Sequence, residues 1–271
     1  MRIILSVSSD IGTALAREWI GNGEPIVGTY RTWSTNCDEL LRVGVTLIKC
    51  DLTSKKSISK ALRKIPTHEA WTVLVMAAGD QKPIGLFREI SFDKWENSIQ
   101  ANFLGMLRIL HSLMTSRKYS ESATVLFFAG GGTNNATERY SAYTISKIAS
   151  IKICELLDFE ESSIKFTILG PGWVKTKIHQ DTLENPKAAG LNFDRTIKMT
   201  QGSEMNPMST VLECCDWVIS QPKEIVGGRN FSVVFDSWGT TELNSALSSN
   251  SNLYKLRRYG NELSFPERTI K

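Results

Sequence analysis

The chain has no apolar run that approaches the ~18 residues needed to span a membrane. Its 5 cysteines form no CxxC pair and have no histidine at metal-ligand spacing, which argues against a zinc site and a disulfide framework. Such cysteines are typical of reduced thiols, and residues 1–10 lack the pattern of a secretory signal. We therefore expect a cytoplasmic protein without a metal site or a membrane anchor.

The chain also has little net charge. The 271 residues include 32 Lys and Arg against 28 Asp and Glu, a formal net charge of +4, and the basic residues are not clustered. Because the positive charge is small and dispersed, we do not expect the chain to bind nucleic acid. With 41% hydrophobic and 22% charged residues, the composition is that of a folded globular protein.

Short apolar runs alternate with helical patterns along most of the chain. Runs rich in Val, Ile, Leu and Phe indicate strands buried on both faces of a parallel sheet. These runs cover residues 3–7, 25–30, 45–50, 72–77, 124–129, 165–169 and 230–235. Helical patterns cover residues 12–21, 54–65, 92–117, 141–159 and 208–220. The alternation predicts a Rossmann-type, doubly wound α/β fold, with a parallel sheet of about seven strands between two layers of helices.

We predict a single catalytic domain over residues 1–236, because no interior linker or repeat is present. Residues 173–207 break the alternation with polar residues, Pro and Gly, and are interpreted as a long substrate loop. Residues 237–271 are rich in Ser and Asn and are predicted to be a partly mobile extension, in which residues 253–258 could dock as a short helix.

The strongest chemical signal is the pair Tyr143 and Lys147, four residues apart on a predicted helix. This spacing places both side chains on one face. A phenol with a pKa near ~10 is a poor acid or base at neutral pH, but a nearby ammonium stabilises the phenolate and lowers that pKa. The pair is suited to exchanging a proton with an alcohol or carbonyl oxygen.

The surroundings strengthen this interpretation, because polar and small residues follow several strands. They include the run 130–133 (Gly-Gly-Gly-Thr) before the helix, Ala78 and Gly79 after another strand, and Pro171 and Gly172 after a third. Ligands of doubly wound sheets bind at the carboxyl ends of the strands. A small-residue loop there lets a ligand approach the backbone closely.

In this order, the motifs resemble the short-chain dehydrogenase/reductase family, and the resemblance covers residues 2–236. The matching features are the Tyr-Lys pair, the AAG run, a helix Asn, an Asp-Leu pair after the third strand and a Pro-Gly pair followed by Thr; they are Tyr143, Lys147, residues 77–79, Asn102, Asp51, Leu52, Pro171, Gly172 and Thr176. The resemblance implies an oxidoreductase that uses a nicotinamide dinucleotide.

The resemblance also implies roles for these residues. Tyr143 would be the general acid/base, Lys147 would bind the ribose hydroxyls and hold the pKa of Tyr143 down, and Asn102 would support a proton-relay water. The expected dinucleotide-binding residues are Ser6, Ser8, Ser9, Asp10, Ile11, Arg31, Asp51, Leu52, Ala78, Gly79, Pro171, Gly172, Val174 and Thr176, together with Tyr143 and Lys147. Gly130, Thr133 and Trp173 are expected to face the substrate.

The dinucleotide loop departs from the family pattern, because Ser6 and Asp10 replace its first two glycines and only Gly12 remains. The loop still joins a strand to a helix, whose N-terminus attracts a pyrophosphate. A carboxylate at Asp10 would repel it. We expect Asp10 to turn away and cap a helix beginning at Ile11, with weakened cofactor binding as the alternative.

The second departure lies thirteen residues before Tyr143, where the family has a serine that hydrogen-bonds the substrate oxygen and this chain has Gly130. Losing one such hydrogen bond typically lowers the rate by ~10²–10³-fold. Thr133, Asn134 or Ser141 are candidates to replace it.

The end of the second strand lacks the carboxylate that would accept the ribose hydroxyls of NAD. Arg31, with Thr32 or Ser34, could hold a 2′-phosphate through charge-assisted hydrogen bonds. NADP(H) is therefore the preferred cofactor, with NAD(H) as the alternative.

The predicted function is the interconversion of a ketone and a secondary alcohol. Similarity of the C-terminal stretch to sugar and surface-polysaccharide enzymes suggests a sugar-derived substrate. The alternatives are an inactive or weakly active nucleotide sensor, motivated by Gly130, and an epimerase that acts through transient oxidation. A homodimer or homotetramer is expected from the family.

Overall fold

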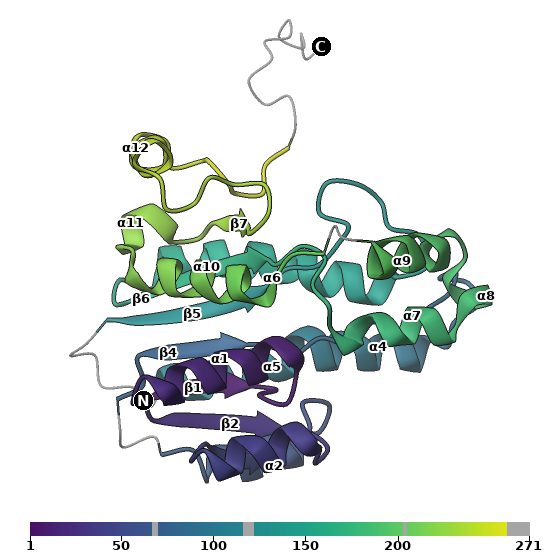
Figure 1. Ribbon diagram of the computed structural model, residues 1–271, viewed down its shortest axis with the longest axis horizontal. Helices are drawn as coiled ribbons and strands as arrows, with labels where there is room; N and C mark the ends of the chain where they lie inside the picture. The colour runs from purple at the N-terminus through teal and green to yellow at the C-terminus, as the bar shows by residue number, and fades with distance from the viewer. Residues whose placement is uncertain (67–69, 116–121, 203–204, 259–271) are drawn as a thin grey trace, which may run out of the picture.

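The computed structural model describes residues 1–66, 70–115, 122–202 and 205–258. These residues form a 7-stranded sheet in the order β3-β2-β1-β4-β5-β6-β7, and all its strand pairs are parallel. Helices cover both faces, so the molecule has three layers (Figure 1). The predicted doubly wound α/β fold is confirmed.

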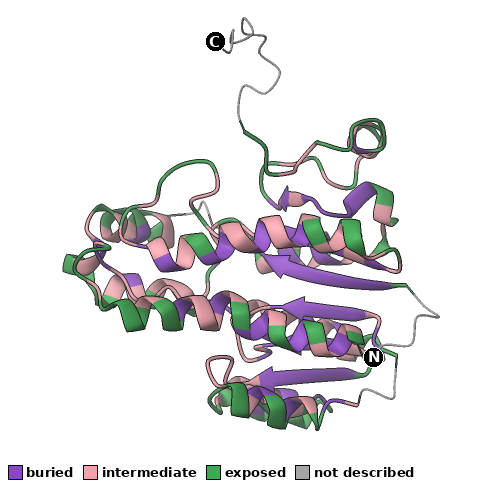
Figure 2. Cartoon of the chain, turned by 180° about the vertical axis from the view of Figure 1, so that it is seen from behind, coloured by how far each residue is buried: buried purple, intermediate pink, exposed green. Residues whose placement is uncertain are grey.

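Every strand lies within or next to an apolar run that the sequence marks. The strands are β1 (Arg2–Leu5), β2 (Ile26–Tyr30), β3 (Thr46–Lys49), β4 (Val73–Met76), β5 (Ala123–Phe128), β6 (Ile164–Gly170) and β7 (Asn230–Ser232). All residues of β4 and β5 are buried, as expected for central parallel strands that are covered on both sides (Figure 2).

The helices pack their apolar faces on two separate cores, one on each side of the sheet. One core includes residues of α3 (Lys55–Leu62), α5 (Gly105–Thr115) and α6 (Ser141–Glu160). The other includes residues of α1 (Asp10–Gly21), α2 (Thr35–Arg42) and α10 (Met208–Ser220). The remaining elements are α4 (Phe92–Ile99), η1 (Gln100–Leu104), η2 (Lys177–His179), α7 (Gln180–Glu184), α8 (Pro186–Ala189), α9 (Leu191–Gln201), α11 (Lys223–Val226) and α12 (Thr241–Ser249).

The prediction of a long irregular loop over residues 173–207 is wrong. That region contains η2 and the helices α7, α8 and α9. These short helices lie beyond the carboxyl ends of the strands (Figure 1). Pro186 starts α8, and Gly190 separates α8 from α9 with φ 57°. Pro186 and Gly190, which indicate a loop in the sequence, therefore mark the boundaries between short helices.

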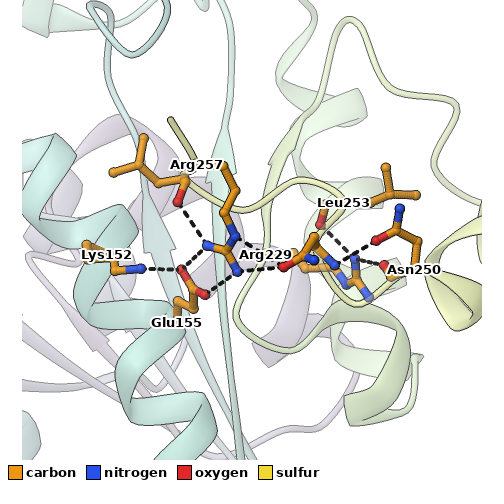
Figure 3. A network of polar contacts seen from close by, with 8 residues as sticks. Lys152, Glu155, Arg229, Asn250, Leu253 and Arg257 are labelled. Atoms are coloured by element: carbon orange, nitrogen blue, oxygen red, sulfur yellow. Dashed lines mark hydrogen bonds and ion pairs between the residues drawn. The ribbon is translucent and has the colours of Figure 1, made fainter. Parts of the chain in front are cut away.

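The C-terminal extension packs on the domain as far as the structure describes it, and its helix is α12 rather than residues 253–258. Arg229, only 3% exposed, donates hydrogen bonds to the carbonyls of Leu247, Asn250 and Leu253 (Figure 3). The guanidinium of Arg257 pairs with the Glu155 carboxylate on α6 at 2.7 Å. Residues 259–271 lie outside the described residues, so the mobility of that part stays a prediction.

The cysteines are free thiols and all 5 are buried. No helix among the described residues is long and apolar enough to cross a membrane. The oligomeric state stays a prediction.

Candidate active site

One large crevice, of about 1120 Å³, opens where the loops after the parallel strands meet. Its walls come from the loops after β1, β4, β5 and β6, from the start of α6, and from α7 and α9. This is the edge where a doubly wound sheet places ligands. Tyr143 and Lys147 line the crevice, as the sequence predicts.

The Tyr143 and Lys147 side chains lie together because they are one turn apart on α6. The Lys147 ammonium is 5.6 Å from the centre of the Tyr143 ring and donates to the Ala78 carbonyl at 3.2 Å. Lys147 is 3% exposed. α6 therefore presents a buried amine beside a phenol, and the loop after β4 holds the amine in place.

The pKa values differ from the sequence-based expectation. Burial raises the pKa of the Tyr143 phenol to about 12. Burial also lowers the pKa of Lys147 to about 8. Desolvation opposes the charged form of each group, and here it outweighs the expected stabilisation of the phenolate by the ammonium. In the protein alone, the pKa of Tyr143 therefore lies above its ordinary value and not below it. The role of Lys147 in lowering that pKa stays a prediction.

Because an ammonium buried at Lys147 is costly, we expect Lys147→Met to raise the free energy of unfolding at pH 7 by about 1–3 kcal/mol. The difference between the ordinary 10.5 and about 8 corresponds to about 3 kcal/mol, less the lost hydrogen bond to Ala78. Between these pKa values, the unfolded chain binds more protons at Lys147 than the folded chain does. The advantage of the variant is therefore full below pH 8 and lost as the pH approaches 10.5.

Urea unfolding of both proteins at pH 7 and at about pH 10 measures this difference. A variant that is no more stable than the wild type at pH 7 would contradict an uncompensated charge at Lys147.

Gly130 lies against the Tyr143 ring. A Cβ atom added at Gly130 would be 2.7 Å from the Tyr143 hydroxyl oxygen and 2.8 Å from its Cε1 atom. The Tyr143 side chain therefore occupies space that a serine at position 130 would need. Tyr143 can take this position only because residue 130 has no side chain.

Of the candidates to replace that serine, Thr133 and Asn134 line the crevice. The Thr133 hydroxyl donates weakly to the Gly130 carbonyl, at 3.5 Å. Ser141 accepts a hydrogen bond from the Trp95 indole at 3.1 Å and is not among the crevice-lining residues. Thr133 and Asn134 therefore remain as possible donors to a substrate oxygen.

The dinucleotide loop corrects one prediction. The helix α1 begins at Asp10, and its N-cap is Ser9, whose side-chain oxygen accepts from the Gly12 amide at 3.1 Å. Asp10 does not cap the helix. Ser9, Asp10 and Ile11 line the crevice, whereas Ser6 and Ser8 are not among its lining residues.

Ser6 has φ 62°, a left-handed conformation that favours glycine, and its amide donates to the Thr29 hydroxyl at 2.9 Å. The loop therefore keeps a turn that glycine usually makes, held by a side chain of β2. At the start of α1, the amides of the first turn have no acceptor within the helix and can face an anion.

Arg31 follows β2 and lines the crevice, as do Ala78 and Gly79. One of its guanidinium nitrogens is 3.7 Å from a carboxylate oxygen of Asp80, and the Arg31 side chain is 63% exposed. This loose ion pair leaves most of the guanidinium available to a ligand.

Besides Ser6 and Ser8, the predicted residues Asn102, Asp51 and Leu52 lie outside the crevice lining. Asn102 is in the π-helical segment η1, where its side chain pairs with the main-chain amide and carbonyl of Asp80, both at 2.8 Å. Asn102 thus fixes the loop that carries Ala78. Asp51 accepts from the Thr53 amide at 2.9 Å, and the carbonyl of Leu52 accepts from Gln100. Their roles in binding or proton relay stay predictions.

After β6, the crevice is lined by Pro171, Gly172, Trp173, Val174 and Thr176. The Trp173 ring stacks on His179, with centroids 5.0 Å apart. The His179 ring bonds to the Val174 carbonyl at 3.0 Å, and burial lowers the pKa of His179. His179 thus supports Trp173 rather than acting as an obvious acid or base.

Sequence reasoning did not connect the loop after β1 with residues 177–182. Lys177 bonds to Asp10 and Ser8, and Thr182 bonds to Gln81 and Tyr140. The only sequence signal was the unexplained Asp10. A sequence gives no direct indication of contacts between residues so far apart.

The sequence and the fold are both similar to those of known proteins. A family model described as short chain dehydrogenase matches residues 2–187. Serine 3-dehydrogenase of Agrobacterium fabrum is 23% identical over 240 residues, which are 82% of this chain and 89% of that protein.

Two solved structures share the fold. A short-chain dehydrogenase/reductase from Saccharomyces cerevisiae superposes with a TM-score of 0.76 at 19% identity, covering 90% of this chain and 98% of the other. The closed form of a serine dehydrogenase complexed with NADP⁺ superposes with a TM-score of 0.74 at 16% identity, covering 89% and 98%.

Proposed function

Because the chain belongs to the short-chain dehydrogenase family, we propose that it is an NADP(H)-dependent oxidoreductase that interconverts a ketone and a secondary alcohol. The observation that carries this proposal is the Tyr143–Lys147 pair inside the large crevice. A half-buried phenol beside a buried amine suits proton exchange with an oxygen of a bound substrate.

The residues around the crevice fit a dinucleotide. The first turn of α1, at Asp10 and Ile11, suits a pyrophosphate. Ala78, with its single methyl group, and Gly79, which has no side chain, would leave room for an adenosine, and Val174 and Thr176 would contact the carboxamide. When bound, the nicotinamide ring supplies the hydride chemistry.

Within this proposal, Tyr143 gives a proton to the carbonyl oxygen during reduction and takes it back during oxidation. Lys147 binds ribose hydroxyls and supplies positive charge beside the phenol. Substrate and cofactor would replace part of the solvent around both groups. Thr133 or Asn134 donates the second hydrogen bond to the substrate oxygen, in place of the serine that is absent at position 130.

The substrate is proposed to be small and polar. The crevice lining includes polar residues that suit hydroxyl, carboxylate or amide groups, among them Asn134, Asn135, Thr137, Asn192 and Arg195. The similarity to a serine 3-dehydrogenase supports a polar substrate of this kind. A sugar derivative, suggested by the sequence, remains one candidate within that class.

The alternative function is a nucleotide sensor with little catalysis, which the raised pKa of Tyr143 and the glycine at position 130 favour. An epimerase acting through transient oxidation is a further alternative, but it also requires proton transfer at Tyr143. Consumption of NADPH with a panel of polar ketones, including keto-sugars and 3-keto acids, tests the proposal. Turnover supports an oxidoreductase, and tight dinucleotide binding without turnover of any ketone supports the sensor.

The proposed cofactor preference predicts a selective effect of Arg31→Ala. Charge-assisted hydrogen bonds to a 2′-phosphate contribute about 1.5–3 kcal/mol, so the Kd of NADPH should rise about 10- to 100-fold. The Kd of NADH should change by less than about threefold, because NADH lacks that phosphate.

Calorimetric titration with both dinucleotides measures the two changes. Arg42→Ala, at the exposed end of α2, is a matched control for loss of one positive charge. An equal loss of NADH and NADPH affinity in Arg31→Ala would refute the phosphate role.

A further inference from the structure

Two reciprocal hydrogen bonds join the loop after β1 to the segment after β6. The Lys177 amide donates to an Asp10 carboxylate oxygen at 2.7 Å. In return, the Lys177 ammonium donates to the Ser8 carbonyl at 2.7 Å. These partners are 167 and 169 residues apart in sequence, so the contacts join two segments of the crevice region that come from distant parts of the chain.

The same segment also contacts the neighbouring loop, residues 79–82 after β4. The side chain of Ile178 packs against Gly79, where an added Cβ atom would be 3.3 Å from Ile178 Cδ1. The Asp181 carboxylate is 2.7 Å from the Lys82 ammonium. Thr182 completes this side with a 3.0 Å hydrogen bond to Gln81. Residues 177–182 thus form a strap in the crevice wall that is attached to the loops after β1 and β4.

We propose that the hydrogen bond between Asp10 and the Lys177 main chain is a latch that holds the strap closed, and that it sets how fast a bound dinucleotide leaves. This inference rests on the proposed function, because it takes the crevice to be the dinucleotide site. The strap borders Asp10 and Ile11, the residues expected beside the pyrophosphate.

The latch also explains why a carboxylate is present at the position where the family pattern has glycine. The Asp10 carboxylate is engaged by the Lys177 amide, and the ammonium of the same lysine is bound to the same loop. The positive charge that Lys177 brings to this loop, two residues before Asp10, partly offsets the repulsion of a phosphate by Asp10. Asp10 is thus a positioning residue that acts through the strap.

The decisive comparison is between Asp10→Ala and Asp10→Asn. Both variants remove the negative charge, so both lose the same repulsion and the same favourable interaction with the α1 dipole. Only Asn keeps an oxygen that can accept from the Lys177 amide. We expect NADPH to leave Asp10→Ala about three- to tenfold faster than it leaves Asp10→Asn, the range for one neutral hydrogen bond.

Stopped-flow displacement of bound NADPH measures both rates. Lys175→Ala removes an exposed positive charge from the same stretch of chain, two residues before Lys177, and should release NADPH at the wild-type rate. Equal release from the two Asp10 variants would overturn the latch, and so would a Lys175→Ala effect as large as that of Asp10→Ala.

Amide hydrogen exchange in the protein without dinucleotide gives a second readout. The Lys177 amide should exchange about three- to tenfold faster in Asp10→Ala than in Asp10→Asn. Equal exchange in both would also overturn the proposal. If the wild type bound no dinucleotide, the proposed function would fail, whereas the exchange experiment would still decide whether the latch exists.

Discussion

Tyr143→Phe is expected to lower kcat by about 10²–10⁴-fold, the usual contribution of a positioned general acid or base. The phenyl ring keeps the packing against Gly130 but has no hydroxyl to exchange a proton. The Kd of NADPH should change by at most about tenfold, because at most one hydrogen bond to the cofactor is lost. Steady-state kinetics and calorimetry on the same preparations separate these two effects.

Tyr30→Phe is the matched control, since it also removes one tyrosine hydroxyl. Tyr30 ends β2, contacts Trp33 edge-on and is not among the crevice-lining residues. Its kcat should equal that of the wild type. Turnover that survives Tyr143→Phe would refute the assigned acid/base, even if the protein still bound NADPH.

Adding a methyl group at position 130 is the second change with a large expected effect. In Gly130→Ala, the new Cβ atom would lie 2.7 Å from the Tyr143 hydroxyl oxygen, so the ring must move. Displacement of a catalytic group by about 1 Å can lower the rate by about 10²-fold. We therefore expect kcat to fall by at least about tenfold, with NADPH affinity almost unchanged.

Gly130→Ser is the informative partner of this variant, because it carries the same Cβ atom and adds a hydroxyl. Steric displacement of Tyr143 predicts a loss of kcat in both variants. A serine variant faster than the wild type would show that Tyr143 yields readily and that the chain lacks only a hydrogen-bond donor. Kinetics of the three proteins with one ketone decide between these outcomes.

Much of the fold could be predicted from the sequence, because burial on both faces leaves a direct trace in composition. Strands such as β4 and β5 are uninterrupted runs of apolar residues, and their boundaries follow from the polar residues on either side. Residues 177–201 could not be read in this way. Their helices are short and their apolar faces are small, so Pro186 and Gly190 dominated the local pattern.

In the candidate site, too, local features could be predicted from the sequence and contacts between distant segments could not. The Tyr143–Lys147 pair is a local feature of one helix, and its spacing alone indicates a shared face. The contact of Gly130 with Tyr143, and that of Asp10 with Lys177, depend on how distant segments meet. The pKa of Tyr143 likewise depends on burial, which spacing does not reveal.

The central claim is that the crevice beside Tyr143 and Lys147 binds a nicotinamide dinucleotide that carries a 2′-phosphate. Calorimetric titration of the wild-type protein with NADPH, and then with NADH, tests it most directly. We predict saturable binding of NADPH to each chain, with weaker binding of NADH. Failure of both dinucleotides to bind would contradict the account.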